Sequence, residues 1–157
     1  MPSKIDDVDR GILDCLRVDA RMKSTEIAKR LGNMTPRAIR NRLDRLVAEG
    51  YISLGACAIP ENLGLPISAD IAMDVEPGMV EEVARELVKM EETNYVAMST
   101  GDTDISVSLV AASMGDLQDI INHKLHSIPG VRKTRTYILT KILKLSCNWP
   151  FPKDLPD

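Results

Sequence analysis

The sequence of residues 24–50 is STEIAKRLGNMTPRAIRNRLDRLVAEG, and its helix-start and helix-stop signals decide the fold of the first part of the chain. Ser24 can cap a short helix that ends at Gly32, because glycine is favoured directly after a helix C-terminus. Thr35 can cap a longer second helix, since Pro36 suits the first helical position and another glycine follows the helix end. A short helix, a tight turn and a longer helix in this order predict a helix-turn-helix.

The residues on either side of this motif extend the first domain. Asp6 can cap a further helix upstream, in which apolar residues recur at helical spacing until about Val18. Downstream, residues 51–59 have β-strand character and predict a small hairpin, or an extended wing and linker, before Pro60. We therefore place a (winged) helix-turn-helix domain at residues 1–60.

Residues 61–144 predict a second domain with the element order β-α-β-β-α-β. The expected elements are the strand 67–75, the helix 80–90, the strands 95–100 and 104–111, the helix 114–128 and the strand 131–143. This order is typical of a ferredoxin-like α+β fold, in which helices cover one face of an antiparallel sheet. The apolar arc of the first of these helices includes both Leu87 and Val88. Residues 145–157 form a Pro-rich tail that we expect Trp149 and Phe151 to anchor.

The strands of this second domain contain more apolar residues than one covered sheet face requires. These residues are Ile67, Ile71, Val75, Val107, Leu109, Ile138 and Ile142. A monomer rarely exposes such a patch, so we expect a second subunit to cover the other face of the sheet.

The composition and the distribution of charge limit the class of protein. The net charge is −3, but residues 1–60 hold 11 Lys/Arg against 8 Asp/Glu, giving +3, whereas residues 61–157 hold 9 against 15, giving −6. A basic first domain is suited to phosphate.

No apolar run approaches the roughly 18 residues that cross a bilayer, which predicts a cytoplasmic protein without a membrane segment. The three widely spaced cysteines are expected to be reduced thiols: Cys15, Cys57 and Cys147.

The longer helix of the motif has one apolar and one polar arc. Its polar arc presents Arg37, Arg40, Asn41 and Arg45. Arginine pairs with guanine and asparagine with adenine in the major groove of double-stranded DNA. We expect the N-terminal residues of the helix, with Thr35, to lie nearest the bases, and Arg45, Lys23 and Ser24 to lie nearer phosphate. The alternative is a solvated face held by charge pairs such as Arg40 with Asp44.

The other candidate site is the turn at residues 100–104. Its glycine exposes backbone N–H groups that suit a carboxylate, while Asp102 and Asp104 suit an ammonium, and these are the two ends of an amino acid. The alternative is an ordinary Gly-Asp turn. His123 and His126 lack an obvious third ligand, so we predict no metal site. We find no nucleophile or Gly-rich phosphate motif, and therefore predict no cofactor and no enzyme activity.

These motifs together resemble the Lrp/AsnC, or feast/famine, family of bacterial and archaeal regulators over residues 5 to about 144. The matching stretches are Ile5-Asp6-x-x-Asp9, Arg21-x-x-x-x-Glu26-Ile27-Ala28, Thr35-Pro36-Arg37-Ala38-Ile39-Arg40-Asn41-Arg42-Leu43, Gly50-Tyr51-Ile52, Glu61-Asn62-Leu63-Gly64 and Thr100-Gly101-Asp102-x-Asp104. Each motif is loose, but their order and spacing are specific. The Pro-rich tail departs from the short ending usual in the family.

The resemblance implies a DNA-binding transcriptional regulator modulated by an amino acid or a related metabolite. It implies homodimers that pair sheet to sheet and assemble further, up to octamers. It also implies effector roles for Gly101, Asp102, Asp104, Thr134 and Thr136. One alternative is an enzyme subunit similar to siroheme decarboxylases, which share this two-domain plan, although no histidine or large basic cluster falls in the expected pocket region. The other is an effector-free assembly partner of another regulator.

Overall fold

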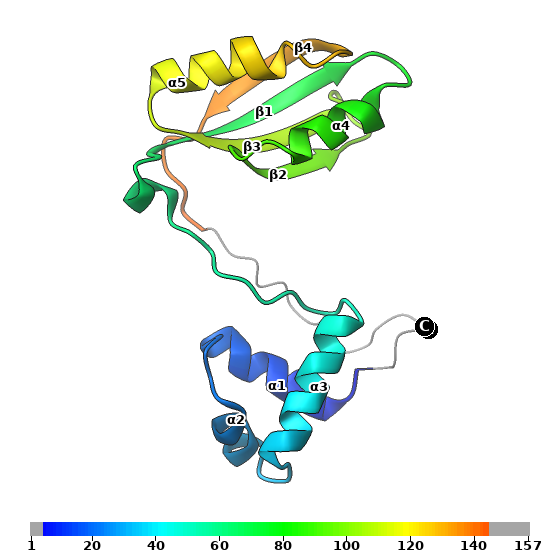
Figure 1. Ribbon diagram of the computed structural model, residues 1–157, viewed down its shortest axis with the longest axis vertical. Helices are drawn as coiled ribbons and strands as arrows, with labels where there is room; N and C mark the ends of the chain where they lie inside the picture. Colours follow the sequence, from blue (N-terminus) through cyan, green and yellow to red (C-terminus); the bar gives the residue numbers. More distant parts are fainter. Residues whose placement is uncertain (1–4, 145–157) are drawn as a thin grey trace. The chain divides into compact units, whose positions relative to one another are not determined.

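The computed structural model describes residues 5–144, and these residues form two compact units (Figure 1). Among the described residues, the first unit covers residues 5–56 and the second covers residues 57–144. The predictions for Cys147, Trp149 and Phe151 lie outside the described residues. No helix within the described range is long and apolar enough to cross a membrane.

The first unit contains three helices: α1 (Asp7–Val18), α2 (Ser24–Leu31) and α3 (Pro36–Ala48). The predicted caps at Asp6 and Thr35 are confirmed, because their side chains accept hydrogen bonds from the backbone N–H groups of Asp9 and Ala38. The predicted cap at Ser24 is wrong. Ser24 is the first helical residue, and the preceding Lys23 caps the helix with its backbone carbonyl alone, which accepts from two N–H groups of the first turn.

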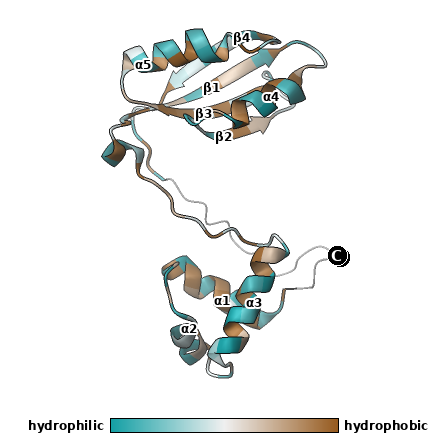
Figure 2. Ribbon diagram, viewed as in Figure 1, coloured by the Kyte–Doolittle hydropathy of each residue, from teal (hydrophilic) through white to brown (hydrophobic). Residues whose placement is uncertain are grey.

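The three helices enclose a small apolar core. Ile12, Ile27 and Ile39 are fully buried between them, and Leu46 is buried in a smaller cluster with Ile5. The face of α3 that the sequence predicts to be apolar therefore packs inward, apart from Val47 near its C-terminal end, which is 41% exposed. Figure 2 shows the hydrophobic and hydrophilic bands that this arrangement produces on α3.

The strand character of residues 51–59 does not lead to a strand. The segment has no ladder partner among the described residues, so the predicted hairpin is wrong, and residues 53–59 instead form the extended linker predicted as its alternative (Figure 1). Instead, the N–H groups of Tyr51 and Ile52 donate to the carbonyl oxygen of Leu46 and end α3. β propensity describes side chains that suit a sheet, and it cannot supply the neighbouring strand that makes one.

The second unit is the predicted antiparallel α+β domain. Its elements are β1 (Ile67–Val75), α4 (Val80–Val88), β2 (Thr93–Met98), β3 (Ile105–Ala111), α5 (Met114–Asp119) with a π-helical continuation (Ile120–Leu125), and β4 (Val131–Ile138). The strand order is β2-β3-β1-β4, and every pair is antiparallel. The βαββαβ order is thus confirmed, although β4 ends five residues earlier than the predicted Leu143.

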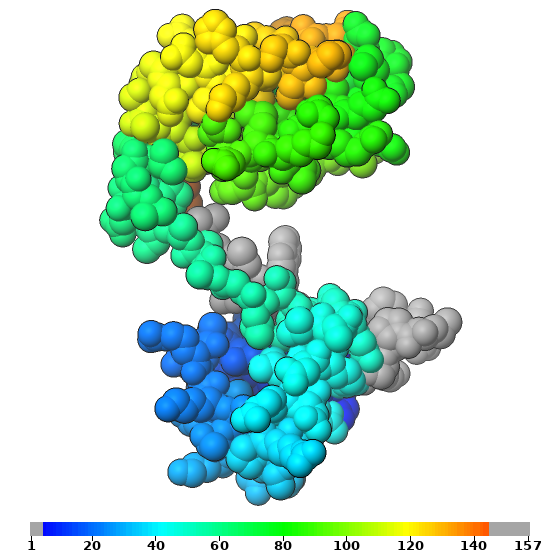
Figure 3. Space-filling view, viewed as in Figure 1, coloured from blue at the N-terminus to red at the C-terminus, as the bar shows by residue number. Residues whose placement is uncertain are grey.

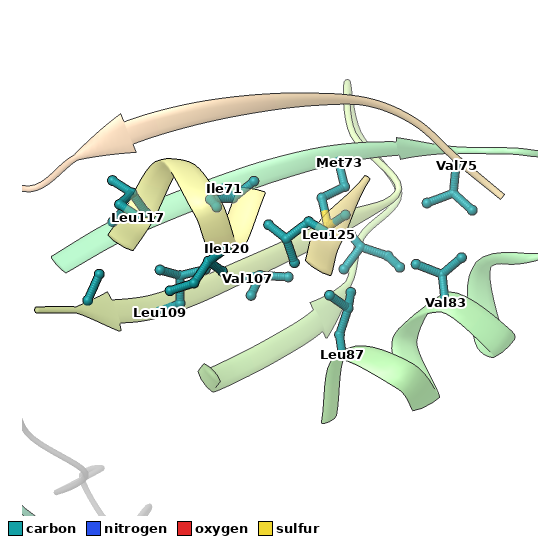
Figure 4. Packing of buried hydrophobic residues seen from close by; sticks show 13 residues of the cluster. Ile71, Met73, Val75, Val83, Leu87, Val107, Leu109, Leu117, Ile120 and Leu125 are labelled. Carbon is teal, nitrogen blue, oxygen red and sulfur yellow. The ribbon is translucent and has the colours of Figure 1, made fainter. Parts of the chain in front are cut away.

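Both helices lie on one face of this sheet, and the core fills the space between them and the strands (Figure 4). Leu87 of α4 and Leu125 of the π-helical turn point into this core, against Met73 and Val107. Val88, predicted to share the buried arc with Leu87, is 68% exposed. The difference arises because Val88 lies 100° around the helix from Leu87, on the side away from the buried Val83.

The face of the sheet without helices is polar, which corrects the expectation of an apolar surface on that side. Antiparallel register pairs Ile71 with Val107, and both point toward the helices. The residues of β1 that alternate with them are Ser68, Asp70, Ala72 and Asp74. Sequence alternation separates the two faces of one strand, but only the register shows that the apolar faces of β1 and β3 coincide.

Candidate nucleic-acid and ligand sites

The outward face of α3 is the candidate nucleic-acid interface. Arg37, Arg40, Asn41 and Asp44 are all exposed on it. Figure 3 shows the stretch that contains α3, in cyan, at the surface of the first unit. Among the residues that the structure describes, no ion pair involves Arg37 or Arg40, and the alternative pair of Arg40 with Asp44 does not form. Two guanidinium groups and one amide are therefore available together at the N-terminal half of this helix.

The other two arginines of α3 turn toward α1 instead. Arg45 donates to Asp9 Oδ2 at 2.5 Å, and Arg42 donates to Asp9 Oδ1 at 2.9 Å and to Asp6 Oδ2 at 2.6 Å. Asp9 is fully buried, while the arginine side chains are about 30% exposed. Arg45, which we expected near phosphate, is thus committed to a carboxylate of its own unit. The sequence offers no signal for this pairing, because the partners are 33 to 36 residues apart.

The charges in this cluster stabilise one another. Burial disfavours the ionised form of Asp6, but hydrogen bonds from the Asp9 backbone N–H and from Arg42 outweigh it and lower the pKa of Asp6. The pKa of Arg42 is raised by its hydrogen bonds to Asp9 and Asp6, and that of Arg45 by its hydrogen bond to Asp9. These groups remain ionised at neutral pH, so the cluster is a set of charge-assisted hydrogen bonds.

Three candidates for phosphate contact remain. Lys23 precedes α2, Ser24 is its first residue, and Thr35 precedes α3. Lys23 and Thr35 are exposed, and Ser24 is half-buried. The Thr35 hydroxyl oxygen accepts the Ala38 N–H at 3.2 Å, which leaves its O–H available to donate. These three positions therefore remain sterically accessible.

The candidate ligand residues at the β2–β3 turn differ in whether their side chains are exposed or already hydrogen-bonded to β1. Gly101 and Asp102 are exposed, whereas the Asp104 carboxylate accepts the backbone N–H of Val75 at 2.7 Å. Thr103 donates through its hydroxyl to the carbonyl of Met73 at 2.8 Å. The turn is therefore fastened to β1, and only its tip is available to a ligand.

Arg135 of β4 is a charged residue at this turn that sequence reasoning missed. It donates to both carboxylate oxygens of Asp74, at 3.0 and 2.8 Å, and to the backbone carbonyl of Asp102 at 3.0 Å. The hydrogen bond from Arg135 lowers the pKa of Asp74. Because three strands meet here only through the sheet register, no local motif marks Arg135.

Thr134 and Thr136, the other predicted ligand residues, point to the opposite face of the sheet from Arg135. They pair with Met73 and Ile71, which face the helices. The Thr134 hydroxyl lies 2.9 Å from Nε2 of His126. The fold of one subunit therefore does not gather the five predicted residues into one site: the turn tip and the two threonines are separate.

The chain matches two family models and several relatives. Residues 5–53 match winged helix-turn-helix DNA-binding domains, and residues 68–149 match the Lrp/AsnC ligand binding domain. The chain is 36% identical over 141 residues to the HTH-type transcriptional regulators LrpA of Pyrococcus horikoshii and of Pyrococcus abyssi, covering 89% of this chain and 99% of each relative.

Solved structures show the same fold. AsnC of E. coli has a TM-score of 0.83 at 24% identity, covering 93% of this chain and 99% of that one. The feast or famine regulatory protein of M. tuberculosis, complexed with L-methionine, has a TM-score of 0.84 at 25% identity, with the same coverage. The domain order, the strand order and these matches agree, and the chain belongs to the Lrp/AsnC family of transcriptional regulators.

Proposed function

We propose that this regulator reads DNA through Arg37, Arg40 and Asn41 of α3. The observation that carries the proposal is the division of α3: Arg42 and Arg45 are held by α1, while these three side chains are exposed and lack ion-pair partners among the described residues. The N-terminal half of a recognition helix is the part that meets base edges in the major groove. Lys23, Ser24 and Thr35 are proposed to contact phosphate.

A homodimer is the proposed DNA-binding unit, because two recognition helices about 34–36 Å apart reach successive major grooves on one side of the duplex. The open sheet face offers a surface for pairing subunits. Tyr95 and Tyr137 point to this side and are 56% and 57% exposed, and aromatic side chains are enriched in interfaces. Assembly beyond the dimer, up to an octamer, is part of the same proposal.

Arg40→Ala is expected to weaken binding to a preferred duplex roughly 5- to 150-fold, because one good base contact contributes about 1–3 kcal/mol. The preferred duplex is the one that the wild-type chain enriches from a random-sequence pool, and binding is measured by mobility shift at fixed salt.

Arg85→Ala is the matched control for this experiment. Arg85 is an exposed arginine on α4 of the other unit, so the substitution removes the same charge without touching α3. Equal affinities for the Arg40 and Arg85 variants would show that α3 is not the reading surface. A chain that shifts no duplex at any salt concentration would instead fit the assembly partner that does not bind DNA.

An amino acid is the proposed effector, with Gly101 and Asp102 as contacts at the turn tip, and Asp104, Thr134 and Thr136 as further candidates. Support comes from two family structures that hold L-methionine, the M. tuberculosis protein and a transcriptional regulator of Neisseria meningitidis. The Neisseria protein has a TM-score of 0.85 at 23% identity, covering 94% of this chain and 97% of that one.

L-methionine and the other common amino acids are the probes for a thermal-shift screen. One of them is expected to stabilise the chain by about 2.7 kcal/mol at a free concentration 100 times its dissociation constant. Asp102→Ala is expected to reduce this effect, while Asp119→Ala, an exposed carboxylate on α5, leaves it intact. Asp104 is unsuited to the test because its carboxylate holds the Val75 N–H. A flat screen would indicate a regulator without an amino-acid effector.

A further inference from the structure

Asp9 is the one fully buried charged residue among residues 5–144, and it touches no part of the proposed DNA-reading face. Removing a carboxylate from water is costly unless hydrogen bonds and opposite charges compensate. At Asp9 they do: Oδ1 accepts from Arg42, and Oδ2 accepts from Arg45 and from the Asp6 backbone N–H at 3.1 Å. Both oxygens therefore accept hydrogen bonds: Oδ1 from α3 alone, and Oδ2 from α3 and from the N-cap residue of α1.

The two arginines that donate to Asp9, Arg42 and Arg45, lie on one flank of α3. At 100° per residue, Arg45 lies about 80° and Arg42 about 140° from Arg37 around the helix axis. Arg37, Arg40 and Asn41 are on the exposed side of this flank, and the buried Ile39 and Leu46 are on the other. The Asp9 contacts thus lie at the border between the packed face and the reading face.

The rest of the contact between α3 and its neighbours is aliphatic. Ile39 and Leu46 bury surface, but the hydrophobic effect is non-directional and does not by itself fix how far α3 is rotated. A rotation of about 10° moves a side-chain tip by roughly 1 Å, since a helix with its side chains has a radius of about 5–6 Å. A displacement of that size takes a reading side chain out of hydrogen-bonding geometry.

We propose that Asp9 is a positioning residue for DNA recognition, which fixes the rotation of α3 through Arg42 and Arg45. The inference rests on the proposed reading face and assigns these two arginines a role that does not involve contact with DNA. Both arginines already form ion pairs with carboxylates of the same unit. They therefore act on DNA binding by setting the directions in which Arg37, Arg40 and Asn41 point.

The test measures the ratio of affinities for two duplexes by mobility shift. One duplex is enriched by the wild-type chain from a random-sequence pool, and the other is a scrambled duplex of the same length and composition. Asp9→Asn and Arg45→Gln are each expected to lower this ratio about tenfold, the size of one lost base contact. The two substitutions change the net charge in opposite directions, so a general electrostatic effect would move affinity oppositely in the two variants.

The double variant separates positioning from direct contact. If Arg45 acts through Asp9, Asp9→Asn/Arg45→Gln is expected to be no worse than either single variant, because both remove the same interaction. If Arg45 contacts phosphate itself, Arg45→Gln weakens binding to both duplexes equally and lowers the salt slope by about one, with the ratio unchanged. That result would overturn the proposal, and so would additive losses.

Two further measurements show whether a lower affinity ratio comes from lost positioning of α3, from a change of charge, or from unfolding. Arg17→Gln removes one positive charge from α1, where Arg17 pairs only with the exposed Asp14 among the described residues, and is expected to keep the wild-type ratio. Circular dichroism at the binding temperature checks that each variant is folded. If Asp9→Asn unfolds, Arg45→Gln decides alone, because it leaves Asp9 paired with Arg42. A wild-type chain that enriches no duplex removes the DNA-reading proposal, whereas an unchanged ratio in Arg45→Gln removes only the positioning role.

Discussion

Replacing Leu87 with alanine is expected to lower the free energy of unfolding of the 57–144 unit by roughly 2–5 kcal/mol, the range for truncating a fully buried leucine. Leu87 is 0% exposed and points from α4 into the core beneath β1 and β3 (Figure 4). Truncation removes apolar contacts and leaves a cavity that this antiparallel sheet cannot close without moving its strands. Hydrogen exchange of the amides in β1 and β3 measures the loss in the full chain.

The neighbouring Val88 provides the control on the same helix. It is 68% exposed, so Val88→Ala is expected to change stability by no more than about 0.5 kcal/mol. Equal destabilisation by the two substitutions would mean that α4 is rotated relative to the arrangement described above.

Replacing Asp9 with alanine is the second substitution with a large expected effect, on the 5–56 unit. It removes the acceptor of Arg42, Arg45 and the Asp6 N–H at once. Breaking a buried pair typically costs about 3–5 kcal/mol, but both arginines are partly exposed and regain water, so we expect roughly 2–4 kcal/mol. A unit of this size is only marginally stable alone, and much of it should therefore unfold on mild heating.

Hydrogen exchange of the α1 and α3 amides measures this effect. Asp14→Ala is the matched control, because the Asp14 side chain is 71% exposed and pairs with Arg17 at 3.6 Å, a surface ion pair that contributes about 0–1 kcal/mol. Asp9→Asn is expected to lower the free energy of unfolding less than Asp9→Ala does, since the amide oxygen still accepts one hydrogen bond. Comparable stability of the Asp9→Ala and Asp14→Ala variants would mean that the buried cluster does not hold α1 against α3.

Local signals in the sequence were sufficient for most of the fold. The caps at Asp6 and Thr35 and the alternation along residues 67–75 depend on neighbours within a few residues, and the structure confirms them. The hairpin at 51–59 does not form, because a strand needs a partner that the segment itself cannot supply, and the segment remains an extended linker. The exposure of Val88 was missed because helical periodicity locates the centre of an apolar arc better than its edge, and Val88 lies at the edge.

For the candidate sites, local sequence signals predicted less, because contacts between residues distant in the sequence decide where some side chains point. Periodicity placed Arg37, Arg40 and Asn41 on an exposed face, as the structure has them. It placed Arg45 there too, because an arginine at the border of a helix face has a long side chain that can turn either way. Only the distant Asp9 decides its direction. Arg135 was missed for the same reason: its partners, Asp74 and the carbonyl of Asp102, meet it only through the sheet.

The polar character of the helix-free sheet face determines how stable a single folded chain is before any association. Ser68, Asp70 and Asp74 are half-buried on this face, and Asp70 and Asp74 accept hydrogen bonds from Ser108 and Arg135, so a single folded chain exposes little aliphatic surface of β1 there. In the proposed homodimer, each chain can then fold completely before it associates, and dilution is expected to return intact single chains rather than denatured ones. Chains of that proposed dimer are therefore expected to exchange partners without unfolding.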